Sequence, residues 1–542
     1  MNLTRGRVVL YFGAIIAVAF ALRLPSLLVN FVNIDENEYA LAAHILNGGG
    51  IPYRDFLIYQ PPAIYYLYAA TFKFFPHLEM ADKMWWVHFA MILVVILSCW
   101  AIYRIAKVID NNRIIGYFSS LFYAIFSTTF LPQDMLGANI ELVMVLPMTL
   151  SVYFFLKGER RFSYYFLSGI FLGLTILTKY QGGILFGAFA IYLFFVRPFW
   201  RGFFPLAAIV VSTAGAVACW AAYLKGHGAW EDTSRCFFYI LQYAKGPAGS
   251  DFIYVTLKFL MRTAMMALAG FVLWYFGSRS VWRILRHWRE TASAHKFLVL
   301  WLIACFVPVV IGGRIYFHYY LLLFPPLSLL AGQWWKVFFD RIRQMPFEKG
   351  AWRLMWFFVA VFIPVTGFTA YATYKPFRPK HKDYWIYTVD YLRERTKAGD
   401  KIFVWGYCPQ IYTMSNRMPA TRFTTADYLT GRTPKTAGLE FDPASPNPPS
   451  VWTKLKRDFG TPSEVIHYDT SDNIFPGAWE LLKADFEKNP PEVIIDTSPS
   501  NYRMYGRYPI AKFPYLKEFV KKNYRFEAAI QGMDLYRLQN PK

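Results

Sequence analysis

Three carboxylates lie close together just after the first long apolar run of the chain, which ends near Val32. Asp35, Glu36 and Glu38 fall where a membrane-spanning helix would leave the lipid. Carboxylates next to hydrocarbon are costly, and they usually face water, a partner or a substrate. A carboxylate within hydrogen-bond reach of a hydroxyl can take its proton. Asp35 is therefore a candidate general base, and Glu36 a candidate acid that orients the site.

The same carboxylates also have a purely local interpretation. Asn33 could cap a helix that begins near Asp35, and Glu36 could complete a capping box. Acidic side chains in a first turn also offset the helix dipole. The sequence leaves both interpretations open, and they are compatible, because a capped helix start is a rigid support for a base.

Two other apolar runs carry basic residues at their ends that could bind an anion. Lys179 ends one run and Gln181 follows it. The alternative for Lys179 is a side chain that reaches from a span to the membrane interface. Arg314 and His318 are one helical turn apart before a later run, so they could share a face. Their alternative is an interfacial arginine and a histidine satisfied among tyrosines.

A further polar group lies at the start of a predicted span over residues 139–156. Glu141 is a few residues inside this apolar helix, where it is not expected to face lipid. It could bind the hydroxyl groups of a ligand. Asn139 or Asp134 could instead cap the helix.

The composition requires a membrane setting for these residues. The 542 residues are 56% hydrophobic and 17% charged, whereas soluble domains carry about 25% charged residues. Repeated apolar runs indicate a polytopic α-helical membrane protein in contact with membrane lipid. The net charge of +22 would suggest nucleic acid in a soluble protein. Here the basic residues cluster in short loops between apolar runs, so no nucleic-acid partner is expected.

Eleven spans are predicted, which places the two chain ends on opposite sides of the membrane. The basic loops all fall on the side of the N-terminus, which is therefore predicted to be cytoplasmic. The first run lacks a small-residue cleavage site and is expected to be a retained anchor. The predicted spans are approximately residues 8–29, 85–108, 114–131, 139–156, 163–178, 182–196, 203–223, 253–276, 297–312, 316–335 and 354–373.

The opposite, outer side receives most of the candidate residues and two predicted domains meet there. Residues 1–374 form the predicted transmembrane domain. Its first outer loop, 33–84, is expected to carry two surface helices, Glu36–Leu46 and Ala63–Phe75. Residues 231–246 form a third candidate surface helix.

Residues 375–542 are predicted to be an extracytoplasmic α/β domain, joined by a linker over 375–380. Strands are expected at 401–405 and 491–496, with a closing hairpin over 527–538. The turns lack a glycine-rich dinucleotide fingerprint, so no cofactor is expected there. Of the five cysteines, only Cys236 and Cys408 are expected to be exposed, and a disulfide between them could form.

Several motifs resemble the GT-C superfamily of membrane glycosyltransferases. The first span followed by Asp35-Glu36, Tyr39 one turn later and Gln60-Pro61-Pro62 before an aromatic run is similar to one branch of that superfamily. This branch contains the bacterial relatives of the protein O-mannosyltransferases and of the lipid A aminoarabinose transferase. The cluster 316–320 before Pro325-Pro326, and the segment 398–406, also match this group.

The resemblance implies an inverting transfer of a sugar from a polyprenyl-phosphate donor to a hydroxyl on a lipid, glycan or protein. The reaction would take place on the outer, periplasmic side of a bacterial inner membrane. Asp35 would be the base and Glu36 would orient the site, while Lys179, Arg314 and His318 would hold the leaving phosphate. Further substrate contacts are expected from Tyr39, Arg54, Gln60, Asn139, Glu141, Gln181 and Tyr319.

Two positions depart from the family pattern. Gln60 stands where relatives carry the lysine of a Lys-Pro-Pro motif, and Glu38 stands where the aminoarabinose enzyme carries a basic residue. Arg54 or Lys179 could supply the missing positive charge. The choice between a monophosphate and a diphosphate donor stays open.

A bound metal and two other functions are alternatives to this interpretation. Oligosaccharyltransferases of the GT-C type use a divalent metal, and Asp35, Glu36, Asp134 and Glu141 could hold Mg²⁺ or Mn²⁺. The narrower group resembled here works without metal, so no metal is expected. A transporter or flippase would show repeat symmetry and polar residues at mid-membrane, neither of which is evident. A non-catalytic assembly subunit is the third alternative.

Overall fold

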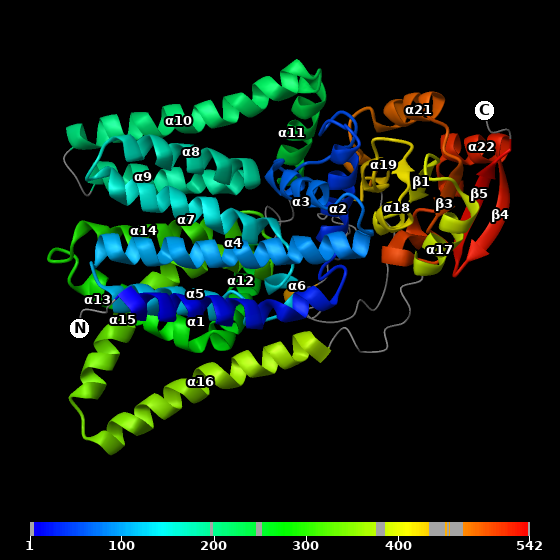
Figure 1. Cartoon of the computed structure of the whole chain (residues 1–542). Helices are drawn as coiled ribbons and strands as arrows, with labels where there is room; N and C mark the ends of the chain where they lie inside the picture. The colour runs from blue at the N-terminus through cyan, green and yellow to red at the C-terminus, as the bar shows by residue number, and fades with distance from the viewer. Residues whose placement is uncertain are drawn as a thin grey trace.

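A bundle of long helices forms most of the N-terminal two thirds of the chain, and a small mixed sheet with its helices lies at one end of that bundle (Figure 1). The computed structural model describes residues 5–195, 199–244, 252–374, 385–432, 450–452, 455 and 470–539. The first described helix begins at the opposite end of the bundle from the sheet. The predicted polytopic helical architecture with a C-terminal α/β part is confirmed.

Seven helices in the described residues are long and apolar enough to cross a membrane. Each corresponds to one of the predicted spans, so the chain is a multi-pass membrane protein. They are Val9–Leu28, which comprises most of α1 (Arg5–Arg23) and the 3₁₀ helix η1 (Leu24–Leu28), α4 (Met80–Ile109), α7 (Ile140–Gly158), most of α10 (Phe199–Gly226), α12 (Phe252–Ala269), α14 (Ser293–Val310) and α16 (Phe347–Tyr374).

The other four predicted spans are helices that are shorter or more charged. α5 (Arg113–Phe126), α8 (Ser163–Thr178) and α9 (Ile184–Phe195) have 14, 16 and 12 residues, fewer than the roughly 20 of a straight crossing. α15 (Phe324–Arg343) ends in a turn with two arginines.

Two predicted boundaries differ from the structure for backbone reasons. The predicted span 316–335 begins as the 3₁₀ helix η4 (Phe317–Leu323), and α15 follows with its prolines in the first turn, where a helix tolerates them. The predicted span 253–276 is interrupted at Gly270, after which α13 (Phe271–Arg286) begins.

Small residues let neighbouring helices of the bundle approach closely. Gly169 and Gly173 lie one turn apart on α8, and a Cβ at either would meet Ser212 or Ala216 of α10 within 2.6 Å. The Thr213 hydroxyl also donates to the Gly169 carbonyl at 3.0 Å. This small-xxx-small arrangement is how membrane helices pack without a hydrophobic driving force between them.

Three helices lie at the end of the bundle that faces the sheet (Figure 1). They are α2 (Asp35–Asn47), α3 (Ala63–Phe74) and α11 (Trp230–Ala244), and they correspond to the three predicted surface helices. α2 and α3 pack against each other through buried tyrosines, with the rings of Tyr39 and Tyr65 5.6 Å apart. The first turn of α2 is thereby held between the bundle and the C-terminal part.

The C-terminal sheet has the strand order β2-β1-β3-β5-β4. β1 (Lys401–Trp405) pairs in parallel with β2 (Met418–Pro419) and β3 (Val493–Asp496). β5 (Met533–Leu538) is antiparallel to β3 and to β4 (Tyr524–Ile530). The predicted strands and closing hairpin are confirmed, whereas the predicted linker over 375–380 lies outside the described residues.

The C-terminal part contacts the first outer loop directly. The Leu57 amide donates to the Arg422 carbonyl at 2.9 Å, and the Tyr428 hydroxyl donates to the Leu57 carbonyl at 3.3 Å. Packing of this kind also buries Cys236 on α11 and Cys408 after β1, and neither cysteine is in a disulfide. The expectations of exposed cysteines and of a disulfide between them are therefore wrong.

Candidate active site

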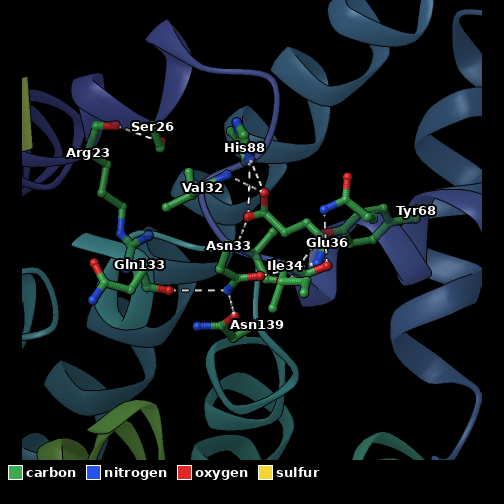
Figure 2. Close-up of polar contacts among 12 residues, drawn as sticks. Arg23, Ser26, Val32, Asn33, Ile34, Glu36, Tyr68, His88, Gln133 and Asn139 are labelled. Carbon is green, nitrogen blue, oxygen red and sulfur yellow. Dashed lines mark hydrogen bonds and ion pairs between the residues drawn. The ribbon is translucent and has the colours of Figure 1, made fainter. Parts of the chain in front are cut away.

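Asn33 and Glu36 fasten the start of α2 to the loop that precedes α7 (Figure 2). The Asn33 side-chain oxygen accepts from the Glu36 amide at 3.1 Å, and its nitrogen donates to the Gln133 carbonyl at 3.2 Å and to the Asn139 side-chain oxygen. Asn139 in turn donates to the Asp134 carbonyl at 2.9 Å. Asn33 therefore caps the helix as expected, whereas the expected capping box is absent because the Glu36 carboxylate accepts from Val32 and Ala138 instead. The Asn33 side chain also joins two segments about 100 residues apart.

The Glu36 side chain is fully buried. Its carboxylate accepts from the amides of Val32 and Ala138, both at 2.6 Å, and lies 3.3 Å from Nε2 of His88 on α4. Three segments therefore meet at this carboxylate. These contacts fix Glu36 in place directly beside Asp35.

A cavity of about 290 Å³ opens beside Asp35, between α2, the start of α7, the end of α8 and the segment before η4. It is lined by Asn33, Ile34, Asp35, Tyr39, Tyr59, Gln60, Gln133, Asp134, Ile140, Glu141, Lys179, Arg314, Tyr316, His318 and Tyr319. Segments from five distant parts of the sequence thus surround one carboxylate. The volume is near the lower end of the roughly 300–1,000 Å³ typical of small-molecule sites.

Cations and carboxylates alternate on one wall of this cavity. Lys179 forms an ion pair with Glu141, and its ammonium lies 4.1 Å from the centroid of the Tyr319 ring. Nδ1 of His318 lies 3.0 Å from Asp134. Its Nε2 is 4.0 Å from the second oxygen of Glu141. Glu141 therefore holds both cations, and an ion-paired His318 is favoured in its protonated, positively charged form.

The backbone that carries Arg314 is strained and held in place. Ile315 has φ +51°, a left-handed conformation that is a genuine outlier for a β-branched residue. The guanidinium of Arg262 on α12 donates to the carbonyls of Arg314 and Ile315 at 3.2 and 2.8 Å, and it lies over the Phe317 ring. Strain of this kind costs on the order of 1–3 kcal/mol and is concentrated at functional sites.

Asp35 has the electrostatic setting of a base. Burial raises the pKa of its carboxyl, and Glu141 and Glu36 raise it further, while His318 and Lys179 oppose the shift. A carboxylate with a raised pKa is a better proton acceptor near neutral pH than an ordinary aspartate. Asp35 also lies in the same cavity as the cations that could stabilise a leaving anion.

Most of the predicted site residues line this cavity, and four do not. Asp35, Tyr39, Gln60, Glu141, Lys179, Arg314, His318 and Tyr319 are in its wall. Glu36 and Asn139 belong to the buried network behind it. Arg54 pairs with Asp55 at 2.7 Å and donates to the His227 carbonyl, and Gln181 lies in the 3₁₀ helix η2 (Tyr180–Gly183).

Sequence reasoning missed several residues that shape the site. His88 and Arg262 were overlooked, although an ionisable residue inside an apolar run is itself a functional signal. Tyr59 adjoins the Gln60-Pro61-Pro62 motif and could have been found with it. Gln133 and Tyr316 flank the predicted Asp134 and His318.

The carboxylates do not converge on a metal. Asp134 faces His318, Glu141 faces Lys179, and Glu36 is directed into its buried network. Across the described residues, no three histidine, cysteine, aspartate or glutamate side chains group closely enough to hold a metal ion. Three of the four carboxylates named for Mg²⁺ or Mn²⁺ are engaged elsewhere and only Asp35 is not, so no chemical step is assigned to a metal.

Comparisons with known proteins agree with this architecture. The sequence model for dolichyl-phosphate-mannose-protein mannosyltransferases matches residues 59–221. No curated protein sequence matches the chain. Among solved structures, ArnT from Cupriavidus metallidurans bound to undecaprenyl phosphate has a TM-score of 0.60 at 14% identity, with both chains covered completely.

The oligosaccharyltransferase of Archaeoglobus fulgidus is also similar in structure. Its complex with zinc and sulfate has a TM-score of 0.56 at 14% identity, covering 97% of this chain and 73% of the other. Its complex with an inhibitory peptide and dolichol-phosphate has a TM-score of 0.57 at 12% identity, covering 98% and 74%. The chain therefore has the fold of the GT-C glycosyltransferases, as the sequence motifs predicted.

Proposed function

We propose that the protein is an inverting glycosyltransferase that moves one sugar from a polyprenyl-phosphate donor to a hydroxyl acceptor. The observation that carries the proposal is the single cavity in which Asp35 lies together with Lys179, Arg314 and His318. A base and a set of cations in one cavity are what direct displacement of a phosphate from an anomeric carbon requires. The similar structures that hold undecaprenyl phosphate and dolichol-phosphate support a lipid-phosphate donor.

The reaction is a single displacement. A carboxylate oxygen of Asp35 takes the acceptor proton while the acceptor oxygen attacks the anomeric carbon. The bond from that carbon to the phosphate oxygen breaks, and its electron pair stays on the phosphate. Lys179, Arg314 and His318 stabilise the charge that develops there, and Glu141 and Asp134 hold two of these cations in position.

The cavity volume, its polar side chains and the predicted membrane topology indicate the size of the sugar, the absence of a metal and the side of the membrane. A cavity of about 290 Å³ fits one hexose or pentose with its phosphate, and the reaction proceeds without a metal. Helix α2, which carries Asp35 in the cavity wall, lies at the bundle end next to the C-terminal part (Figure 1). With the basic loops in the cytoplasm, this end faces the periplasm of a bacterial inner membrane. The acceptor is a lipid, glycan or protein hydroxyl.

The test measures sugar transfer by purified protein in lipid nanodiscs, using radiolabelled polyprenyl-phosphate sugars and a panel of acceptors. The change Asp35→Asn keeps the size of the side chain and removes the base, so turnover is expected to fall by about 10²–10⁴-fold. Binding of polyprenyl phosphate should be unchanged. Transfer at the normal rate by the variant would overturn the assignment of the base.

The same preparation distinguishes the alternative functions. A lipid-linked sugar transporter would move the labelled donor between the leaflets of a vesicle without transferring the sugar. An assembly subunit would do neither alone. Either result with wild-type protein, over the full acceptor panel, would overturn the proposed activity.

A further inference from the structure

A second, smaller cavity lies behind Asp35, between α2 and the C-terminal part. Its volume is about 30 Å³, which holds one or two water molecules and is too small for a sugar. Glu38, one turn after Asp35 on the same helix, lies in its wall. The far wall is formed by residues 424–425, 427–428 and 432 of the C-terminal part.

The two cavities adjoin each other. Tyr59 lines both of them. Asp35 and Glu38 are three residues apart on α2, a spacing that places side chains next to each other on a helix. The two carboxylates also interact electrostatically, because the negative charge of Asp35 raises the pKa of Glu38. A carboxylate of the reaction cavity and a carboxylate of the water-sized cavity are therefore neighbours.

Polar groups continue from Glu38 toward solvent. The Tyr407 hydroxyl donates to the Glu38 carboxylate. Beyond it, Asp427 pairs with Arg432 at 3.1 Å and accepts from the Tyr505 hydroxyl. The side chains of Asp427 and Arg432 are 19% and 11% exposed, so the far wall retains access to water.

The charged and titratable groups around Glu38 come from every element that packs against it. They are Asp35 on α2, Tyr65 on α3, Tyr239 on α11, and Tyr407, Asp427, Tyr428 and Arg432 of the C-terminal part. Burial is the largest influence and raises the pKa of Glu38 to about 8. A carboxyl group of this kind can accept and release a proton near neutral pH.

The proposed transfer reaction creates a need for such a group. Each turnover leaves the acceptor proton on Asp35, which is buried and must be ionised again before the next turnover. The glycosylated acceptor and the leaving phosphate still occupy the reaction cavity at that point. A separate exit for the proton lets Asp35 recover without the release of these groups.

We propose that Glu38 is a proton relay that takes the acceptor proton from Asp35 and passes it to water in the small cavity. The proposal rests on the proposed function. The acceptor O–H bond breaks, and its proton binds a carboxylate oxygen of Asp35. The proton then moves to an ionised oxygen of Glu38, which restores the Asp35 carboxylate, and Glu38 releases it to water as hydronium. No oxidant or other reactant is required.

The test compares the wild-type protein with Glu38→Gln in the transfer assay. The glutamine keeps an oxygen that can accept from Tyr407 but cannot carry a proton away. Turnover should fall by about tenfold or more while the KM for the donor changes little. In the wild-type protein, turnover should rise with pH through about 8, because only the ionised Glu38 can accept a proton. Glu38→Gln should lose this inflection.

Chemical rescue separates a relay from a structural contact. Ammonia is a base no larger than water, so ammonium buffer should restore turnover of Glu38→Gln in proportion to its concentration and leave the wild-type rate unchanged. Tyr407→Phe removes the hydrogen bond that lowers the pKa of Glu38 but keeps the carboxylate, so the pH inflection should remain and move to higher pH. The exposed Glu79, which pairs with Arg393 at 3.3 Å, provides Glu79→Gln as a matched control with normal turnover.

These experiments distinguish a failure of the relay from a failure of the proposed function. A wild-type protein without transfer activity would overturn that function. An active wild-type protein whose pH inflection and turnover persist in Glu38→Gln would overturn the relay alone. Loss of turnover in Glu38→Gln without rescue by ammonia, together with an equal loss in Tyr407→Phe, would assign Glu38 a structural role instead.

Discussion

Two histidine–aspartate pairs lie at opposite ends of the helix bundle. At the cavity end, His318 is 3.0 Å from Asp134. At the other end, His295 at the start of α14 is 2.9 Å from Asp110, the residue that ends α4. α4 has 30 residues, so it separates the two ends by about 45 Å. All four side chains are partly buried to a similar degree, between 13% and 23% exposed.

The two pairs differ in their surroundings rather than in their own geometry. Asp110 also accepts from the Gln333 amide of α15 at 3.2 Å, so the pair at that end ties three helices together. His318 instead has a second carboxylate, Glu141, within 4.0 Å, and it lines the cavity with Asp35 and Lys179. The same pair of side chains can therefore be a structural contact or part of a binding site. Its neighbours decide which.

The largest loss of stability at the cavity end is expected from a change at Glu36, which lies outside the cavity. Glu36→Gln leaves one of the two amides, of Val32 or Ala138, without an oxygen acceptor and brings a nitrogen donor against it. Breaking a buried charge network of this kind costs about 3–5 kcal/mol. Thermal unfolding in nanodiscs should occur at lower temperature, and transfer activity should fall in parallel with the folded fraction.

That result would differ from the result for Asp35→Asn, which removes activity without a comparable loss of stability. If Glu36→Gln kept normal stability and lost only turnover, Glu36 would act on the substrate directly. The contrast between the supporting carboxylate and the reacting one would then be wrong.

Smaller effects, on ligand affinity or on stability, are expected when each histidine is removed in turn. His318→Ala takes away one charged donor to the leaving phosphate, and hydrogen bonds to charged groups contribute about 1.5–3 kcal/mol. The affinity for polyprenyl phosphate should fall by about 10–100-fold. His295→Ala removes a pair of the same geometry far from the cavity, so this affinity should be unchanged while the unfolding temperature decreases. Equal losses of affinity in both variants would show that the two histidine–aspartate pairs do not differ in their role in binding.

The smallest effect is expected from the removal of metal ions. Asp134 and Glu141 are paired with His318 and Lys179, so they are not available as ligands. Incubation with EDTA followed by desalting should change turnover by less than about twofold, which is within ordinary assay variation. Loss of activity that returns on addition of Mg²⁺, Mn²⁺ or Zn²⁺ would show that the cavity pair rearranges to bind a metal.

The sequence predicted the residues of the cavity better than their environment. Asp35, Lys179 and His318 were identifiable because each is an ionisable residue next to an apolar run, where its presence needs an explanation. Their mutual contacts were not predictable, because Glu141 meets Lys179 and His318 only through the packing of distant helices. The same limit explains Cys236 and Cys408, which lie outside the apolar runs of the predicted spans but are buried by tertiary packing.

The fold was predictable where one local rule decides the structure. Strand β1, with its run of apolar residues between Gly399-Asp400 and Gly406, is an example. The spans were less certain, because α8 and α9 are short helices whose position depends on close contacts such as that between Gly169 and Ser212. Two buried cations, Lys258 and Arg262, also shorten the most apolar stretch of α12.

The helix α16 connects the bundle to the residues of the C-terminal part, and it leans away from its neighbours (Figure 1). Only Gly350 and Ala372 are buried along its 28 residues. At about 42 Å long, it exceeds the hydrocarbon core of about 30 Å and must tilt to keep its apolar side chains in lipid. Its tilt is set by ring contacts such as that of Phe357 with Trp335, whose centroids are 4.4 Å apart, together with the bilayer. Membrane thickness therefore acts on the helix that leads to the C-terminal part. The acyl-chain length of the lipid is therefore an experimental variable for this protein, as temperature and salt are.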